Sequence, residues 1–296
     1  MTPNSTPRTI AIYGSRRQEQ YLSKIADLLR LLQDNGFQIV IHPNLYKYLL
    51  DKIDLPESCL SAMEIPSEAE AALSIGGDGT FRGARALSKY GINVICIPAT
   101  IDNDISCTNY SIGFDTAANT AIDCIDRLRD TMQSHERCSV VEVMGRNAGY
   151  LAMYVGLAIG ATAVLVPEEP IDFNRDVIEK IRQARLNGFT HYMIVVAEGA
   201  GSAADIAAKI HDEIDLEPRV TVLGHIQRGG VPPGRDRVNA TKMGFLAVEL
   251  LLQGKTNRIV STNDGAFVDV DIDEGLEMKR RIQRMEVNVL SAMTGI

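Results

Sequence analysis

A chain of 296 residues is long enough for about two domains, and 45% hydrophobic with 23% charged residues is an ordinary globular composition. The formal net charge of −8 argues against a nucleic-acid-binding protein and against a protein that binds acidic membranes. An anionic substrate is not excluded, because local arginines and a metal ion override the overall charge.

The five cysteines form no CxxC pair, and their odd number favours reduced thiols in a cytoplasmic protein. The first eight residues are polar and include two prolines, which is unlike the apolar core of a secretion signal. The longest apolar run, residues 151–166, is too short to span a bilayer. We therefore expect a cytoplasmic protein with no membrane partner.

Short apolar runs alternate with amphipathic segments along the chain. In the first part we expect, in order, a strand at 9–13, a helix at 19–35, a strand at 38–42, a helix at 45–53, an irregular stretch at 55–70, a strand at 71–75, a helix at 81–89 and a strand at 93–97. In the second part we expect a helix at 115–131, a strand at 139–143, a helix at 150–159, a strand at 163–166, a helix at 174–187, a strand at 192–197, a helix at 203–214, a strand at 220–223, a helix at 236–252, strands at 259–261 and 266–270, and a helix at 274–284.

This alternation indicates βαβ units and a mostly parallel sheet, so the fold class is α/β. Ligands of such sheets bind beyond the carboxyl ends of the strands. The loops that follow the strands are therefore where functional residues are expected.

The first of these loops is glycine-rich and carries one acid. Residues 76–80 read Gly-Gly-Asp-Gly-Thr between a strand and a helix. Glycines let the backbone approach a ligand, and the start of the following helix favours phosphate. Asp78 can hold Mg²⁺ directly or through water. The structural alternative is a tight turn, which would be the better explanation for a single pair of glycines.

The second loop brings two carboxylates close together in the sequence. Asp102 and Asp104 flank Asn103 and follow Thr100, directly after the strand at 93–97. In such a pair one carboxylate can act as a general base while the other binds a metal ion. Two acids this close also raise one pKa unless a cation lies between them. Taken alone, the loop is better explained by a solvated turn, whereas its position at the end of a strand favours a function.

Three further loops follow strands of the second part. They contain the segment 144–147 (MGRN), the acid Glu198 and the segment 224–230 (GHIQRGG). Singly, each arginine or histidine there is explained by a surface ion pair or a structural role. Together, five strands are expected to direct acids, arginines and a histidine to one sheet edge, which suits a phosphorylated substrate with hydroxyl groups.

From about Arg82 onward the chain strongly resembles the 6-phosphofructokinase family. The motifs that carry the resemblance follow the family's order over about two thirds of the chain: residues 98–105 (PATIDNDI), 125–131 (IDRLRDT), 134–137 (SHER), 139–146 (SVVEVMGR), 166–168 (VPE) and 221–230 (TVLGHIQRGG). The resemblance implies Rossmann-like, mostly parallel sheets in two lobes. It implies a nucleotide lobe at 1–114, a sugar-phosphate lobe at 115–255, and a C-terminal segment at 256–296 that packs back on the nucleotide lobe.

The first 80 or so residues are more similar to bacterial NAD kinases. The similarity lies in the strand that ends at Gly14 (AIYG), the helix after it and the segment 74–81 (SIGGDGTF). The chain therefore resembles a hybrid of two related kinase families joined near residues 76–82. Two alternatives to phosphofructokinase activity follow: an NAD kinase, and a hybrid, natural or engineered, that binds ligands with little turnover.

The resemblance implies an ATP-using kinase that needs Mg²⁺ and acts on the 1-hydroxyl of fructose 6-phosphate. Asp102 would be the base, Thr100 and Asp104 would assist it, and Arg146 would stabilise the transferred phosphoryl group. The metal would lie near Asp78 and Asp104. Gly79 and Ala99 are similar to the ATP-using branch of the family. The implied nucleotide-binding residues are Gly14, Gly76, Gly77, Gly79, Thr80, Arg82 and Gly83, and the implied substrate-binding residues are Arg137, Met144, Gly145, Arg146, Glu198, Arg219, His225 and Arg228.

Two implied roles concern assembly and regulation. Arg137 and Arg219 match arginines that reach into a neighbouring subunit's sugar site, so a homodimer or homotetramer is expected. At the family's effector site Arg129 is present, but a threonine, Thr162, replaces an acid. Asn187 and Phe189 replace lysines, so activation by ADP is not expected.

Overall fold

The computed structural model describes residues 8–14, 22–63, 69–130, 137–280, 282 and 284–294, and these form two compact units. Unit 1 contains the described residues of Met1–Thr100, Ile105–Gly113 and Pro232–Lys279. Unit 2 contains those of Ile101–Asp104, Phe114–Val231 and Arg280–Ile296. The chain therefore leaves and re-enters unit 1 within one loop.

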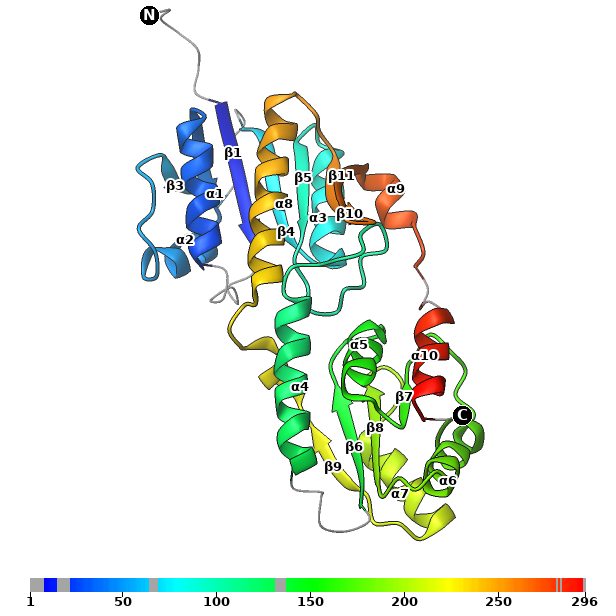
Figure 1. The fold of residues 1–296 in the computed structure, drawn as a ribbon. Helices are drawn as coiled ribbons and strands as arrows, with labels where there is room; N and C mark the ends of the chain where they lie inside the picture. The colour runs from blue at the N-terminus through cyan, green and yellow to red at the C-terminus, as the bar shows by residue number, and fades with distance from the viewer. Residues whose placement is uncertain are drawn as a thin grey trace, which may run out of the picture. The chain divides into compact units, whose positions relative to one another are not determined.

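Unit 1 is built on a seven-stranded sheet in the order β11-β10-β5-β4-β1-β2-β3, parallel except for the pair of β10 and β11 (Figure 1). The strand bounds are β1 Arg8–Gly14, β2 Phe37–Ile41, β3 Cys59–Ser61, β4 Ala69–Gly76, β5 Asn93–Pro98, β10 Arg258–Asn263 and β11 Ala266–Asp271. The order runs outward in opposite directions from β1 and β4. That is the switch point at which α/β sheets bind ligands.

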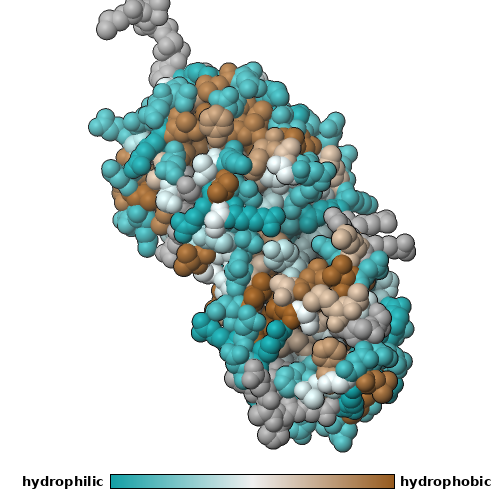
Figure 2. All heavy atoms as spheres, viewed as in Figure 1, coloured by the Kyte–Doolittle hydropathy of each residue, from teal (hydrophilic) through white to brown (hydrophobic). Residues whose placement is uncertain are grey.

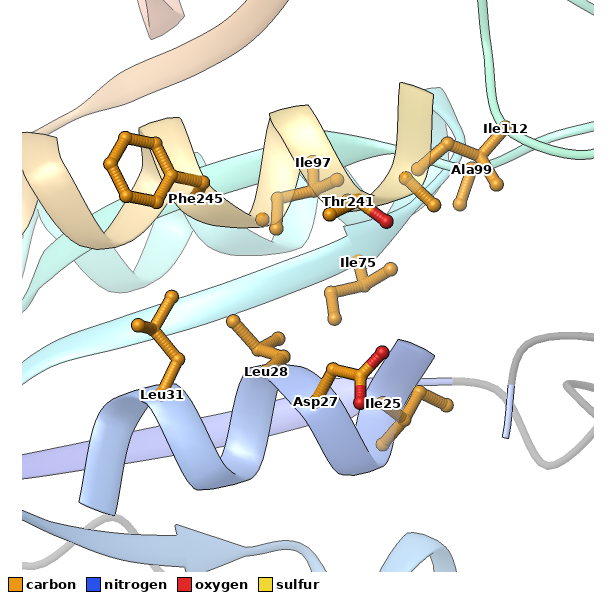
Figure 3. Close-up of a pocket in the computed structure, with 12 residues that line it drawn as sticks. Ile25, Asp27, Leu28, Leu31, Ile75, Ile97, Ala99, Ile112, Thr241 and Phe245 are labelled. Atoms are coloured by element: carbon orange, nitrogen blue, oxygen red, sulfur yellow. The ribbon is translucent and has the colours of Figure 1, made fainter. Parts of the chain in front are cut away.

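Helices pack on both faces of this sheet. Alternate residues of a strand point to opposite faces, so Val94 and Cys96 of β5 join the core cluster beneath α3 while Ile97 faces α1 and α8 (Figure 3). The helices of unit 1 are α1 Leu22–Asp34, α2 Pro43–Leu50, α3 Asp78–Ser88, α8 Gly234–Leu252 and α9 Ile272–Glu277. Figure 2 shows hydrophobic residues on the surface of unit 1 over α8, where Phe245 is 56% exposed.

Unit 2 contains a four-stranded parallel sheet in the order β7-β8-β6-β9. Its strands are β6 Arg137–Val143, β7 Ala163–Leu165, β8 His191–Ala197 and β9 Arg219–Val222. Its helices are α4 Phe114–Asp130, α5 Tyr150–Ile159, the π-helix η2 Asn174–Ile178, α6 Glu179–Leu186, α7 Ala203–Ile214, the 3₁₀-helix η3 Gly224–Arg228 and α10 Arg284–Thr294. Buried aliphatic residues of β6, β8 and α7, with Tyr192, form its core.

The expected elements are confirmed along most of the chain, with three corrections. The stretch expected to be irregular contains β3, which pairs with β2. The single helix expected at 274–284 is wrong, because α9 ends at Glu277 and a separate helix, α10, begins at Arg284. The glycine-rich loop is shorter than expected, since α3 already begins at Asp78. The first three residues of the helix expected at 19–35 lie outside the described residues.

The two units also divide the chain differently from the three expected segments. Residues 232–255 belong to unit 1 rather than to the sugar-phosphate lobe, and the described residues from 280 onward belong to unit 2. The expectation that five strands direct their loops to one sheet edge is wrong, because β4 and β5 lie in one sheet and β6, β8 and β9 in another. No helix within the described ranges is long and apolar enough to cross a membrane.

Candidate active site

The predicted nucleotide residues of unit 1 lie at or just after the carboxyl ends of two neighbouring strands, β1 and β4. Gly14 ends β1 and pairs in register with Ile75 of β4, and Gly76 pairs with Pro98 of β5. These strand ends flank the switch point of the sheet. The structure therefore brings the first glycine of the set, Gly14, beside the glycine-rich turn.

The glycine-rich turn is closed on one side and open on the other. A Cβ atom on Gly76 would lie 2.4 Å from the hydroxyl of Thr80, so only glycine fits there, whereas at Gly79 and Gly83 a Cβ would meet nothing within 4 Å. The carboxylate of Asp78 accepts a hydrogen bond from the Gly79 amide at 2.6 Å and lies 3.5 Å from Arg82. The exposed start of α3 is therefore accessible to a ligand.

The loop after β5 has both ends in unit 1 and its central residues, 101–104, in unit 2. Thr100 donates its amide hydrogen to the Ser111 hydroxyl at 2.8 Å. Asp102 and Asn103 are buried, and Asn103 has a left-handed backbone with φ of 51°. The solvated turn considered from the sequence is thus wrong for this segment, because its first acid is withdrawn from water.

The buried carboxylate of Asp102 has an altered acidity. Burial raises its pKa from 3.8 to about 6, and the nearby negative charge of Asp104 acts in the same direction. The positive charges of Arg146 and Arg228 lower it only partly. A pKa near 6 leaves this carboxylate ionised at neutral pH but able to accept a proton, which suits a general base.

Arg146 lies on a turn after β6 that side chains from two other loops hold in shape. Its backbone is left-handed, with φ of 53°, and Gly145 before it has φ of 151°. Glu198, after β8, accepts hydrogen bonds from the amides of Gly145 and Arg146. Gln227 accepts one from the Met144 amide at 2.8 Å. The structure thus brings together the three loops of unit 2, which are three of the five predicted loops.

Gln227 was not among the residues predicted from the sequence. It lies in η3, between His225 and Arg228, and its side chain is fully buried. Its amide nitrogen makes no hydrogen bond within the described part of the chain. The only sequence signal for Gln227 is its position inside the GHIQRGG segment, between two residue types that commonly bind phosphate. His225 and Arg228, in contrast, are exposed at the same carboxyl end of the sheet.

Arg137 and Arg219 do not join these residues within one chain. They begin β6 and β9, whereas Met144 and η3 follow the opposite ends of the same strands. Six residues of strand at about 3.3 Å each put Arg137 roughly 20 Å from Val143. A contribution to a sugar-phosphate site from these arginines would therefore have to go to another copy of the chain.

A separate cavity of about 210 Å³ lies at the predicted effector position in unit 2. Arg129, Gly160, Thr162 and His191 line it, but Asn187 and Phe189 do not. The hydroxyl of Thr162 is engaged by the Met193 amide at 3.1 Å. Insensitivity to ADP stays a prediction.

The carboxylates named for Mg²⁺ have suitable chemistry but do not form a ready-made site. No group of three or more His, Cys, Asp or Glu that could bind a metal occurs in the described ranges. Mg²⁺ usually takes one or two carboxylates together with waters and substrate phosphates. Asp78, with 42% of its side chain exposed, fits a metal that arrives with a nucleotide.

Comparison with known proteins identifies the class of protein to which this fold belongs. The family model "Phosphofructokinase" matches residues 64–251. The chain belongs to the phosphofructokinase family. Residues 1–63 lie outside the matched range.

Two bacterial relatives are half identical to the chain over the matched region. ATP-dependent 6-phosphofructokinase 1 of Clostridium perfringens is 53% identical over 211 residues, which are 71% of this chain and 66% of that protein. The ATP-dependent 6-phosphofructokinase of Brevibacillus brevis is 51% identical over 215 residues, 73% of this chain and 67% of that protein. The match thus spans about two thirds of the length of each relative.

Solved structures share the fold over nearly the whole chain. Phosphofructokinase of Pichia pastoris in the T-state superposes with a TM-score of 0.76 at 22% identity, covering 100% of this chain and 40% of that one. The pyrophosphate-dependent phosphofructokinase of Marinobacter aquaeolei superposes with a TM-score of 0.71 at 16% identity. The superposition covers 97% of this chain and 91% of that one. These identities support the fold alone, and the α/β class with mostly parallel sheets is confirmed.

Proposed function

We propose that this chain is an ATP-dependent 6-phosphofructokinase, which transfers the γ-phosphoryl group of ATP to the 1-hydroxyl of fructose 6-phosphate. The observation that carries the proposal is the buried carboxylate of Asp102, with a pKa of about 6 and the Arg146 guanidinium 3.7 Å away. The names of the bacterial relatives supply the reaction class.

In the proposed step, the oxygen of the sugar 1-hydroxyl bonds to the γ-phosphorus of ATP, and Asp102 accepts the proton of that hydroxyl. The bond from the γ-phosphorus to the bridging oxygen breaks, and ADP leaves. Arg146 stabilises the negative charge on the transferred group, since phosphoryl transfer depends mainly on positioning and charge neutralisation. Thr100 and Asp104 assist from the same loop.

The nucleotide is assigned to the glycine-rich turn of unit 1. The proposal is supported by the open side of the turn at Gly79 and Gly83, where backbone can approach phosphate, and by the start of α3 behind it. Gly14, Gly76, Gly77, Thr80 and Arg82 complete the assigned set. Mg²⁺, held by Asp78 and Asp104, would neutralise charge on the phosphate oxygens.

The sugar phosphate is assigned to unit 2. His225 and Arg228 would bind its phosphate, and Met144, Gly145 and Glu198 its hydroxyls. One oxygen of Glu198 already accepts from two backbone amides, so its other oxygen is the one left for a hydroxyl. Arg137 and Arg219 would act in a neighbouring copy, which requires a homodimer or homotetramer. A cytoplasmic location agrees with this role.

A coupled assay with ATP, Mg²⁺ and fructose 6-phosphate tests the proposal. We expect fructose 1,6-bisphosphate at a few turnovers per second or more, as for ordinary kinases. Absence of product, together with absence of sugar-phosphate binding by calorimetry, would refute the proposal. Binding without turnover would instead support the alternative of a weakly active hybrid.

The predicted likeness of the first 80 residues to NAD kinases has no support in the comparisons, whose family match begins at residue 64. The hybrid origin stays a prediction. The alternative of NAD kinase activity is tested by adding NAD in place of the sugar phosphate, and NADP formation would be the positive result.

A further inference from the structure

The first turn of α8 contains a buried carboxylate to which the proposed reaction assigns no role. Asp236, the third residue of this helix, has no exposed surface. It accepts a hydrogen bond from the phenol of Tyr110 and a second, at 2.8 Å, from the amide of Gly113. A buried carboxylate is stable only when such donors meet it, so its contacts hold the donors in place.

Both donors belong to the loop that carries Asp102. The returning arm of this loop, residues 105–113, is bound to the outgoing arm twice. The Ile112 amide donates to the Pro98 carbonyl at 3.0 Å, and the Thr100 amide donates to the Ser111 hydroxyl at 2.8 Å. A shift of the returning arm would therefore move Thr100, the last residue before the segment 101–104.

The anchor spans 126 positions of sequence, so local chain stiffness cannot replace it. The guanidinium of Arg235 lies 4.6 Å from the centre of the Tyr110 ring, which adds a cation–π contact on the same side chain. Asp236 follows the segment 224–230 by only six residues.

We propose that Asp236 is a positioning residue, which through Tyr110 and Gly113 sets the conformation of the loop carrying Thr100, Asp102 and Asp104. The inference rests on the proposed function. Neither Asp236 nor Tyr110 is assigned a contact with substrate. Their loss should therefore lower kcat with little change in KM.

The chain offers a matched control for the loss of the Tyr110 hydroxyl. Tyr192 is equally buried, and its hydroxyl donates to the Phe189 carbonyl at 3.0 Å, in the sheet of unit 2. Tyr110→Phe and Tyr192→Phe each remove one oxygen and the hydrogen bond that it donates, which is buried for Tyr110 and partly buried for Tyr192. We expect both substitutions to lower the midpoint of thermal unfolding. Only Tyr110→Phe should lower kcat, by tenfold or more, with KM for ATP and fructose 6-phosphate within twofold of the wild type.

Asp236 itself gives a second, graded test. Asp236→Asn keeps an oxygen acceptor for the two donors, and Asp236→Ala removes it. We expect kcat to fall further in Asp236→Ala than in Asp236→Asn. Unchanged kcat in Tyr110→Phe, or equal kcat losses in Tyr110→Phe and Tyr192→Phe, would overturn the positioning role.

The proposed function and the positioning role can fail independently. The activity of the wild type tests the function, whereas the comparison of the variants tests the positioning role. If the wild type forms no fructose 1,6-bisphosphate, amide hydrogen exchange of residues 99–113 still tests the anchor. Exchange there should speed up in Tyr110→Phe and stay unchanged in Tyr192→Phe. Equal exchange in both variants would overturn the inference.

Discussion

The guanidinium of Arg146 lies 3.7 Å from the carboxylate of Asp102, yet this close positive charge does not make Asp102 a strong acid. The arginine side chain is 67% exposed, whereas that of the aspartate is 6% exposed. Solvent weakens the arginine's field, and burial together with Asp104 prevails, so the pKa is about 6. The same pair thus combines a buried proton acceptor with an exposed positive charge.

The activity should depend on the ionisation of Asp102. We expect kcat to rise with pH on an acid limb centred near 6, because only the ionised carboxylate accepts the hydroxyl proton. Asp102→Asn should lower kcat by about 10²–10⁴-fold and abolish that limb, with little change in sugar-phosphate binding. Steady-state kinetics of the wild type and of Asp102→Asn between pH 5 and 8 measure the acid limb and the fall in kcat. A large loss of binding with unchanged turnover would mean that the role is misassigned.

The same substitution should stabilise the fold at neutral pH. The pKa of Asp102 in the folded protein lies above its ordinary value of 3.8. Between about pH 4 and pH 6 the unfolded chain therefore binds fewer protons at this residue than the folded protein does. The wild type therefore loses stability as pH rises through that window. Asp102→Asn escapes this loss and should be more stable above pH 6, by at most about 3 kcal/mol. Urea unfolding of the wild type and of Asp102→Asn at pH 4 and pH 7.5 measures this change in stability. An equal difference in the free energy of unfolding between the two proteins at both pH values would contradict the prediction.

Gln227 should matter for the sugar-phosphate site although it is buried. Gln227→Leu leaves the Met144 amide without its acceptor, at a cost of about 1–3 kcal/mol. The turn that carries Arg146 should loosen, and fructose 6-phosphate should bind about tenfold more weakly or worse by calorimetry. Gln253→Leu, at the exposed end of α8, is the matched control. Unchanged binding in Gln227→Leu would show that Glu198 alone holds the turn.

An apolar pocket of about 240 Å³ lies between α1 and α8 over the ends of β4 and β5 (Figure 3). A Cβ at Gly244 would point to Leu28 at an ordinary 3.8 Å. Gly244→Ala should therefore stabilise the protein by about 1 kcal/mol, because the helix gains propensity and the pocket narrows. At Gly275 in α9 a Cβ would lie 2.7 Å from Ile259, so Gly275→Ala should destabilise it. The midpoint of thermal unfolding compares the two variants. A lower midpoint for Gly244→Ala than for the wild type would contradict the packing of α1 against α8.

Mixing two inactive variants tests the assignment of Arg219 to a neighbouring copy. In a mixed dimer of Asp102→Asn and Arg219→Ala, one site keeps both groups only if Arg219 acts across the subunit interface. Refolding the variants together should then restore about a quarter of the wild-type activity, since half of the dimers have one intact site. Each variant refolded alone is the control. No recovery in the mixture would mean that Arg219 acts within its own chain or not at all.

Much of the fold was predictable because its signals are local. Apolar runs with a period of two or 3.6 residues set the strands and helices, and glycines such as Gly36 and Gly91 end helices with positive φ. The predicted loops follow strands, which is a property of chain order. Their residue types therefore indicated phosphate chemistry before any contact was known.

Tertiary structure alone decided which loops meet. The sequence does not show that β4 and β5 join one sheet and β6, β8 and β9 another, because strand pairing depends on residues far apart in the chain. It did not single out Gln227, whose importance comes from the Met144 amide 83 positions away, or the pair of Tyr110 and Asp236. Periodicity reports which face of an element is buried, whereas these contacts depend on what that face meets.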